Sequence, residues 1–103
     1  MENENIKTFV LENGETIELS LTFAKLYRLR NCSPQEYEKY NKVIMDGAKD
    51  PFDFLRIIYT AYLCHNIESI DECMSFDDFI KIAPFDINNV ITVAMSITTS
   101  KKN

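Results

Sequence analysis

The chain has no tryptophan, one histidine, and only two glycines and three prolines among its 103 residues. Glycine and proline mark turns and loops, so their scarcity favours helices. With one histidine, no glycine-rich phosphate loop and no Gly-x-Ser-x-Gly motif, nucleotide and hydrolase chemistry lack a candidate set of residues. We therefore expect a protein that is not an enzyme and binds no cofactor.

Basic residues are also few, with 11 Lys and Arg against 16 Asp and Glu and a net charge of −5. The densest basic group is Lys25, Arg28 and Arg30, which suits the solvated C-terminal end of a helix. Nucleic-acid binding usually requires a clustered positive surface. The sequence therefore predicts no nucleic-acid partner.

No long apolar run is present. The longest uncharged stretch, Ile87–Ser100, is interrupted by Asn, Thr and Ser, and is too short and too polar to span a bilayer. The first residues, Met1–Asn5, are acidic and polar where a signal peptide would be basic and then apolar. Cys32, Cys64 and Cys73 form an odd set without the spacing of a disulfide framework. We expect a cytoplasmic protein with no membrane partner.

Two patterns suggest a metal site at first sight. Residues 67–78 resemble a calcium-binding EF-hand loop, but Ile67 would stand at the first ligand position and Glu72 where the loop requires glycine. Cys64 and His65 could bind zinc, yet structural zinc sites show paired ligands two to four residues apart, and none occur here. A capped helix and a core cysteine explain these residues better, so we expect no metal. A divergent calcium-binding module remains an alternative.

The segment from residue 6 to about residue 21 predicts a β-hairpin. Asn13-Gly14 is the strongest short signal for a two-residue type I′ turn. Pairing outward from that turn joins Val10 to Ile17, Thr8 to Leu19 and Ile6 to Leu21. All six side chains would share one apolar face, which must pack on the helices that follow.

Capping and breaking signals predict five helices, at about residues 23–31, 34–46, 51–65, 76–83 and 87–98. In the first helix we expect Phe23, Leu26 and Tyr27 on one side. The third helix is apolar on nearly all sides, so it should form the core. The predicted fold is α+β, mostly α: one domain over residues 1–103, with an N-terminal β-hairpin followed by a compact bundle of four to five helices.

The fifth predicted helix carries no charged residue, although exposed helices normally carry several. Two interpretations have equal weight: the helix closes the core from two sides, or part of it meets another chain. The candidate contact residues are Val93, Met95 and Ile97 on this helix, with Tyr37 and Tyr40 as a second patch on the second helix.

Four segments, in matching order and covering most of the chain, carry a family resemblance. They are Phe9–Arg30, Tyr37–Met45, Phe52–Cys64 and Met74–Phe79. Together they resemble the tail assembly chaperones of long-tailed (siphovirus-type) phages and prophages of Gram-positive bacteria.

The resemblance implies a small, mostly helical cytoplasmic protein that is absent from the finished virion. Such a protein would bind the tape measure protein and help to recruit tail tube subunits around it. A homo-oligomer is compatible with this role. The alternative is a structural component that stays in the particle, such as a head–tail connector or a minor tail protein.

Overall fold

The computed structural model describes residues 6–98, so the segment Met1–Asn5, on which the signal-peptide expectation depends, lies outside the described residues. The elements in chain order are β1 (Lys7–Val10), β2 (Thr16–Leu19), α1 (Phe23–Cys32), α2 (Pro34–Asp46), α3 (Pro51–His65), a 3₁₀ helix η1 (Ile67–Glu72), α4 (Phe76–Ile82) and α5 (Ile87–Thr98). The predicted α+β, mostly helical fold with an N-terminal hairpin is confirmed, and each predicted helix lies within one residue of its observed bounds.

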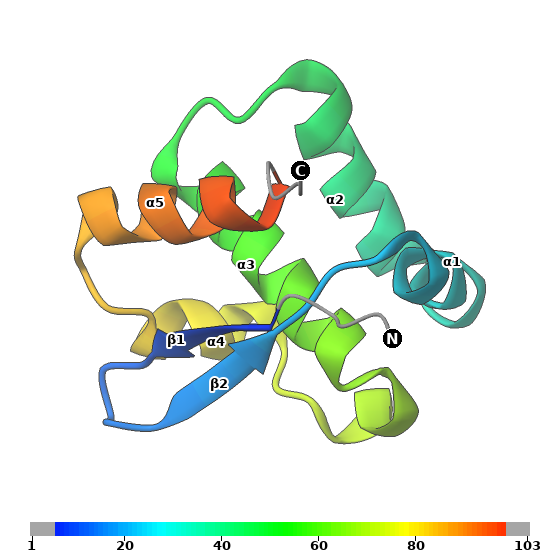
Figure 1. The fold of residues 1–103 in the computed structure, drawn as a ribbon, viewed down its shortest axis with the longest axis horizontal. Helices are drawn as coiled ribbons and strands as arrows, with labels where there is room; N and C mark the ends of the chain where they lie inside the picture. Colours follow the sequence, from blue (N-terminus) through cyan, green and yellow to red (C-terminus); the bar gives the residue numbers. More distant parts are fainter. Residues whose placement is uncertain (1–5, 99–103) are drawn as a thin grey trace.

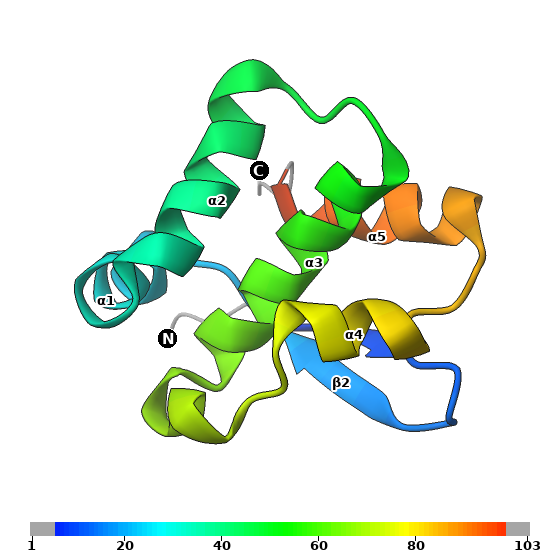
Figure 2. The ribbon, with the colours of Figure 1, turned by 180° about the vertical axis from the view of Figure 1, so that it is seen from behind.

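Helix α3 runs through the middle of the molecule and contacts β2, η1 and the four other α-helices (Figures 1 and 2). Its start is fixed by a capping box. The Asp50 side chain accepts a hydrogen bond from the Asp53 backbone N–H at 3.0 Å, and the Asp53 side chain accepts from the Asp50 N–H at 3.4 Å. Pro51 occupies the first turn, where its missing N–H costs nothing. The predicted role of α3 as the core helix agrees with the burial of most of its residues.

The few polar side chains of α3 join it to its neighbours. Arg56 Nη1 lies 2.8 Å from Glu36 Oε1 of α2, and the Arg56 guanidinium lies 3.7 Å from the centre of the Phe76 ring of α4. The buried Thr60 hydroxyl donates to the Arg56 carbonyl at 2.8 Å. Arg56 therefore links α3 to both α2 and α4.

The hairpin forms, but its predicted register is wrong by one residue. The observed antiparallel partners are Lys7 with Leu19, Thr8 with Glu18, Phe9 with Ile17 and Val10 with Thr16. Since side chains alternate across a strand, the shift turns the other face of β1 toward the helices. Phe9 and Leu11 are buried, whereas Ile6, Thr8 and Val10, expected inside, are exposed. The inward side of β2 agrees with the prediction: Leu19 is buried, and Ile17 and Leu21 pack against the core.

The turn explains the shift. A type I′ turn requires positive φ at both Asn13 and Gly14, but only Gly14 has it, at 91°. The Leu11 N–H donates to the Glu15 carbonyl at 2.7 Å, and the Gly14 N–H donates to the Leu11 carbonyl at 2.9 Å. The loop therefore has three residues, 12–14, and Gly14 takes the left-handed position of a bulge.

Two details of α1 and α2 differ from what their sequence patterns suggest. In α1, Leu29 is fully buried and Leu26 half-buried, while Phe23 and Tyr27 point to solvent. The rows Leu26–Leu29 and Phe23–Tyr27 are adjacent on a helix surface, and packing against α2 and α3 selects the first. In α2, the Ser33 side chain makes no cap hydrogen bond, although Ser33 followed by Glu36 has the pattern of a capping box.

Candidate protein-binding surfaces

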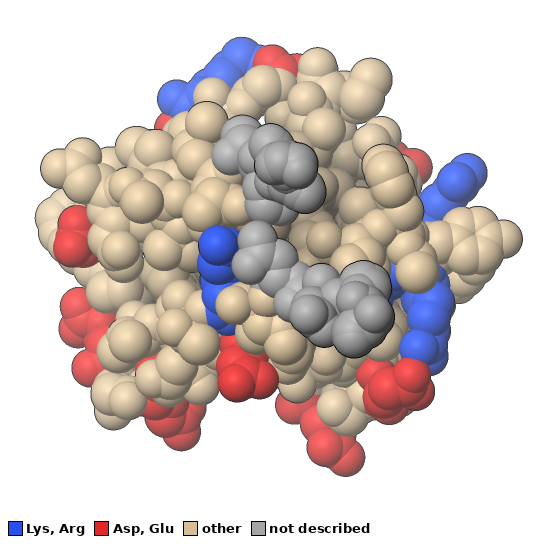
Figure 3. Space-filling model, in the orientation of Figure 1, with Lys and Arg blue, Asp and Glu red and all other residues tan. Residues whose placement is uncertain are grey.

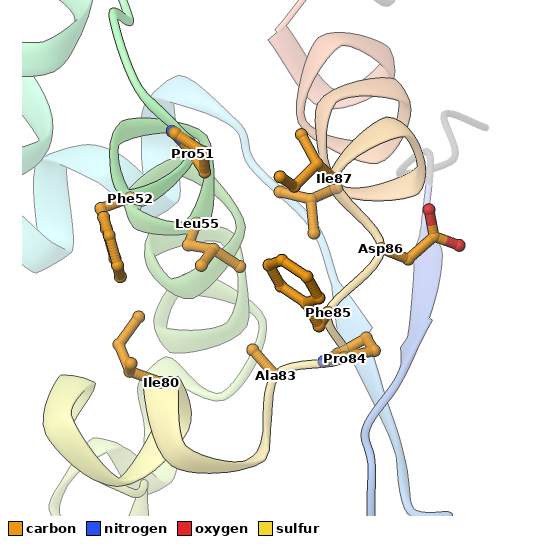
Figure 4. Close-up of a pocket in the computed structure, with 10 residues that line it drawn as sticks. Pro51, Phe52, Leu55, Ile80, Ala83, Pro84, Phe85, Asp86 and Ile87 are labelled. Carbon is orange, nitrogen blue, oxygen red and sulfur yellow. The ribbon is translucent and has the colours of Figure 1, made fainter.

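An open apolar groove of about 370 Å³ lies where α3, α4 and α5 meet (Figure 4). Its wall is formed by Pro51, Phe52, Leu55, Ile80, Ala83, Pro84, Phe85, Asp86, Ile87 and Val90. We call this surface the groove. Figure 4 shows Phe85 facing the space between the α3 residues Phe52 and Leu55 and the α5 residue Ile87, while the Asp86 carboxylate points away. Exposed apolar surface of this kind usually marks a binding site.

The local sequence explains why Phe85 stands at the mouth of the groove. Pro84 ends α4, because the residue before a proline is driven into an extended conformation, as Ala83 is. Asp86 starts α5: its Oδ1 accepts from the Asn89 N–H at 3.2 Å, and its own N–H donates to the Pro84 carbonyl at 2.9 Å. Phe85 thus lies between the proline that ends α4 and the aspartate that caps α5, and its side chain is 89% exposed.

A second apolar surface lies on α1 and the start of α2. We call it the aromatic patch; it consists of Phe23, Leu26, Tyr27, Arg30 and Tyr37. Phe23 is 90% exposed, Tyr27 is exposed, and the Arg30 guanidinium lies 5.8 Å from the centre of the Tyr37 ring. A shallow hollow of about 290 Å³ separates these side chains.

The two surfaces differ in charge. Helix α1 carries three basic and no acidic side chains, whereas the wall of the groove has one acidic residue, Asp86, and no basic one. In Figure 3, Lys and Arg atoms lie at the right edge, where Figure 1 shows α1, and also at the top and near the centre, while most Asp and Glu atoms lie at the left and lower edges. A negatively charged chain therefore presents one locally basic helix.

The five predicted contact residues do not form one surface. Tyr37 lies half-buried in the aromatic patch, while Tyr40 is 8% exposed, belongs to the core and offers little area to a partner. Burial also raises the pKa of the Tyr40 hydroxyl to about 12. On α5, Val93 and Ile97 pack against the core, and Met95 is 47% exposed. The uncharged second side of α5 therefore helps to close the core.

Sequence reasoning missed the most exposed aromatic residues, Phe23, Tyr27, Phe52 and Phe85. Phe85 had a usable signal, because it stands between a helix-ending proline and a helix-starting aspartate and so belongs to no inward stripe. Phe23 and Phe52 occupy the first turns of their helices, where a side chain can point past the core. Only the packing of the helices distinguishes these positions.

A polar network joins the hairpin to the end of α3. His65 Nδ1 lies 3.1 Å from the Ser20 hydroxyl and His65 Nε2 lies 3.0 Å from Glu18 Oε1, while Lys25 Nζ donates to Ser20 Oγ at 3.2 Å. The residue types resemble a hydrolase triad, but the Ser20 hydroxyl is buried and is not offered to a substrate. The Ser20 N–H donates to the Ala61 carbonyl at 3.3 Å, which fixes the same junction. The network ties β2 and α1 to α3.

Within residues 6–98 no group of three His, Cys, Asp or Glu side chains could hold a metal ion. Residues 67–72, the start of the calcium-loop alternative, form the 3₁₀ helix η1. Cys64 is buried, and burial raises the pKa of its thiol to about 12, so it is protonated at neutral pH. Across the same described range, no helix is both long enough and apolar enough to cross a bilayer.

No protein-family model matches the chain, and no curated protein or solved structure matches it either. The exposed surfaces and the sequence resemblance therefore carry the functional inference.

Proposed function

We propose that this protein is a tail assembly chaperone of a long-tailed phage. It acts in the cytoplasm of the bacterial host, where it binds the tape measure protein, helps to recruit tail tube subunits and then leaves the assembly. The sequence resemblance suggests this role, and the observation that carries it is the open groove with Phe85 at its mouth.

The groove has the chemistry that a chaperone of helical segments requires. Nine of its ten wall residues are apolar, and they come from two helices, α3 and α5, the end of α4 and the connection that follows it. An amphipathic helix binds such a groove through apolar side chains at positions i, i+3 or i+4 and i+7. A long apolar helix without a partner would otherwise aggregate. The groove therefore shields one segment of the tape measure protein at a time.

The capture is expected to be reversible. The groove is lined by ten residues, whereas a standard protein interface uses about 20–30 residues on each side, and interfaces at the low end of the size range form transient complexes. Few of its residues would supply most of the binding free energy, and exposed aromatic anchors are the usual ones. Phe85 and Phe52 are the two aromatic residues of the wall, and both are exposed.

The test is binding of overlapping tape measure fragments from the same phage genome by the wild-type protein and by two groove variants, Phe85→Asp and Phe52→Asp. Each variant should weaken binding at least about tenfold, which corresponds to about 1.4 kcal/mol. The control is Met45→Asp, which places the same charge at an exposed apolar residue that belongs to neither the groove nor the aromatic patch. Equal binding by the wild type and Phe85→Asp would remove the groove from the proposal.

A second measurement distinguishes the chaperone from a structural tail or connector protein. Mass spectrometry of purified virions should not detect the chain. Its abundant presence in the particle would support the structural alternative.

A further inference from the structure

We propose that the aromatic patch of one copy docks into the groove of a second copy, so that the protein associates head to tail. This contact uses the same groove that we propose for the tape measure segment, so self-association and binding of that segment compete for one surface. The contact gives a role to Phe23, Tyr27 and Arg30, which the chaperone proposal does not use.

The positions of the two surfaces determine the symmetry. Figure 1 shows α1 at the right of the molecule and the connection between α4 and α5, which carries Phe85, at the left. Surfaces on opposite sides cannot meet within one molecule. Nor can both contacts form in a two-fold dimer, because the patch and the groove would then have to lie on the same face of each copy. Contact between patch and groove is heterologous, and it leaves one free patch and one free groove for further copies.

The shapes and the chemistry of the surfaces are complementary. Phe23 and Tyr27 project from α1 and are well exposed, while the groove offers an apolar hollow of about 370 Å³. Rigid aromatic side chains bury much area at a small cost in conformational entropy. The projecting residues of one copy can therefore enter the hollow of the next.

The charges favour the same pairing. Arg28 is already paired with Glu68, whereas Arg30 makes no ion pair with any residue in the described range 6–98. Across the contact, two acidic residues lie beside the groove: Asp50, which directly precedes Pro51 and caps α3, and Asp86, whose carboxylate caps α5 and points away from the hollow. A basic helix meeting an acidic border accelerates association and disfavours the wrong orientation. Because these charges are exposed, salt should weaken the contact.

The test uses two full-length variants, Tyr27→Asp in the patch and Phe85→Asp in the groove, studied by analytical ultracentrifugation over a range of concentrations. Wild-type protein should form species larger than the 12.0 kDa chain as concentration rises, and the increase should be smaller at high salt. Each variant alone should stay monomeric. An equimolar mixture should give a species of twice the chain mass and no larger one, because each variant supplies the surface that the other lacks.

Three results would overturn the proposal: a wild-type protein that is monomeric at every concentration, a variant that associates alone as the wild type does, or a mixture that stays monomeric. The control is Met45→Asp, an exposed residue on α2 that belongs to neither surface and should associate like the wild type. Circular dichroism checks that each variant is folded. Tyr27→Asp should still bind tape measure fragments, so loss of association and loss of client binding are separate outcomes.

Discussion

Replacing Phe9 by alanine should destabilise the protein severely, whereas replacing its neighbour Val10 should have little effect. Phe9 is 2% exposed and its ring centre lies 6.2 Å from that of Phe79 in α4. Val10 is 57% exposed on the outer face of the hairpin. The two substitutions therefore test directly which face of β1 meets the helices.

The two substitutions should change the free energy of unfolding by very different amounts. Truncation of a buried phenylalanine to alanine costs about 3–5 kcal/mol, through lost transfer free energy and the cavity left behind. A domain of this size has a free energy of unfolding of about 5–15 kcal/mol, so Phe9→Ala removes a large part of it. At about 4–8 °C per kcal/mol, the midpoint of thermal unfolding should fall by about 12–40 °C. Val10→Ala, at an exposed site, should change the free energy by at most about 0.5 kcal/mol.

Urea unfolding followed by circular dichroism measures both values, and the absence of tryptophan makes fluorescence the poorer probe. The slope of the free energy against urea should be the same for both variants if only native stability changes. A two-residue type I′ turn would place Val10 inside and Phe9 outside. A larger cost for Val10→Ala than for Phe9→Ala would therefore refute the observed register.

Three further predictions concern the polar and titratable groups. Arg56→Ala should cost about 3 kcal/mol in urea unfolding, because it leaves the Glu36 carboxylate partly buried and unpaired; a cost below about 1 kcal/mol would contradict this. In native protein at pH 8, a thiol reagent should modify the exposed Cys32 quickly and leave the buried Cys64 unmodified until urea is added. Burial raises the pKa of Tyr40 to about 12, above the value of about 10 in an unfolded chain. The native state then holds the Tyr40 proton more tightly than the unfolded state does. Protonated Tyr40 therefore contributes to the free energy of unfolding below pH 10, and this contribution is lost between about pH 10 and 12. Urea midpoints in that range should fall less steeply in Tyr40→Phe.

The helices could be predicted because their signals are local. Asp50 and Pro51 define the start of α3 within two residues, and the apolar character of α3 on nearly all sides predicts its central place. Ser75 likewise caps α4 by accepting from the Asp78 N–H at 3.1 Å. Such capping signals involve residues that are close in the sequence, so they can be recognised without knowledge of the tertiary structure.

The register of the hairpin could not be read from the turn alone. Asn13-Gly14 suits a two-residue loop and also a three-residue loop that ends in a left-handed glycine. A slip of one residue exchanges the whole inner face, so the choice depends on which side chains the helices can accommodate. Here Phe9 packs beside Phe79 of α4, some 70 residues away in the sequence.

The candidate surfaces could not be predicted from the sequence for a related reason. Apolar periodicity identifies the residues that can be buried, and it cannot say which of two adjacent apolar rows a short helix turns inward. In α1 the row with Leu29 is buried, and that choice leaves Phe23 and Tyr27 in solvent. Exposed aromatic side chains add little to the stability of the fold and raise the tendency to aggregate. Two such surfaces on one chain of 103 residues, one beside basic charges and one beside acidic charges, are therefore better explained by binding than by folding.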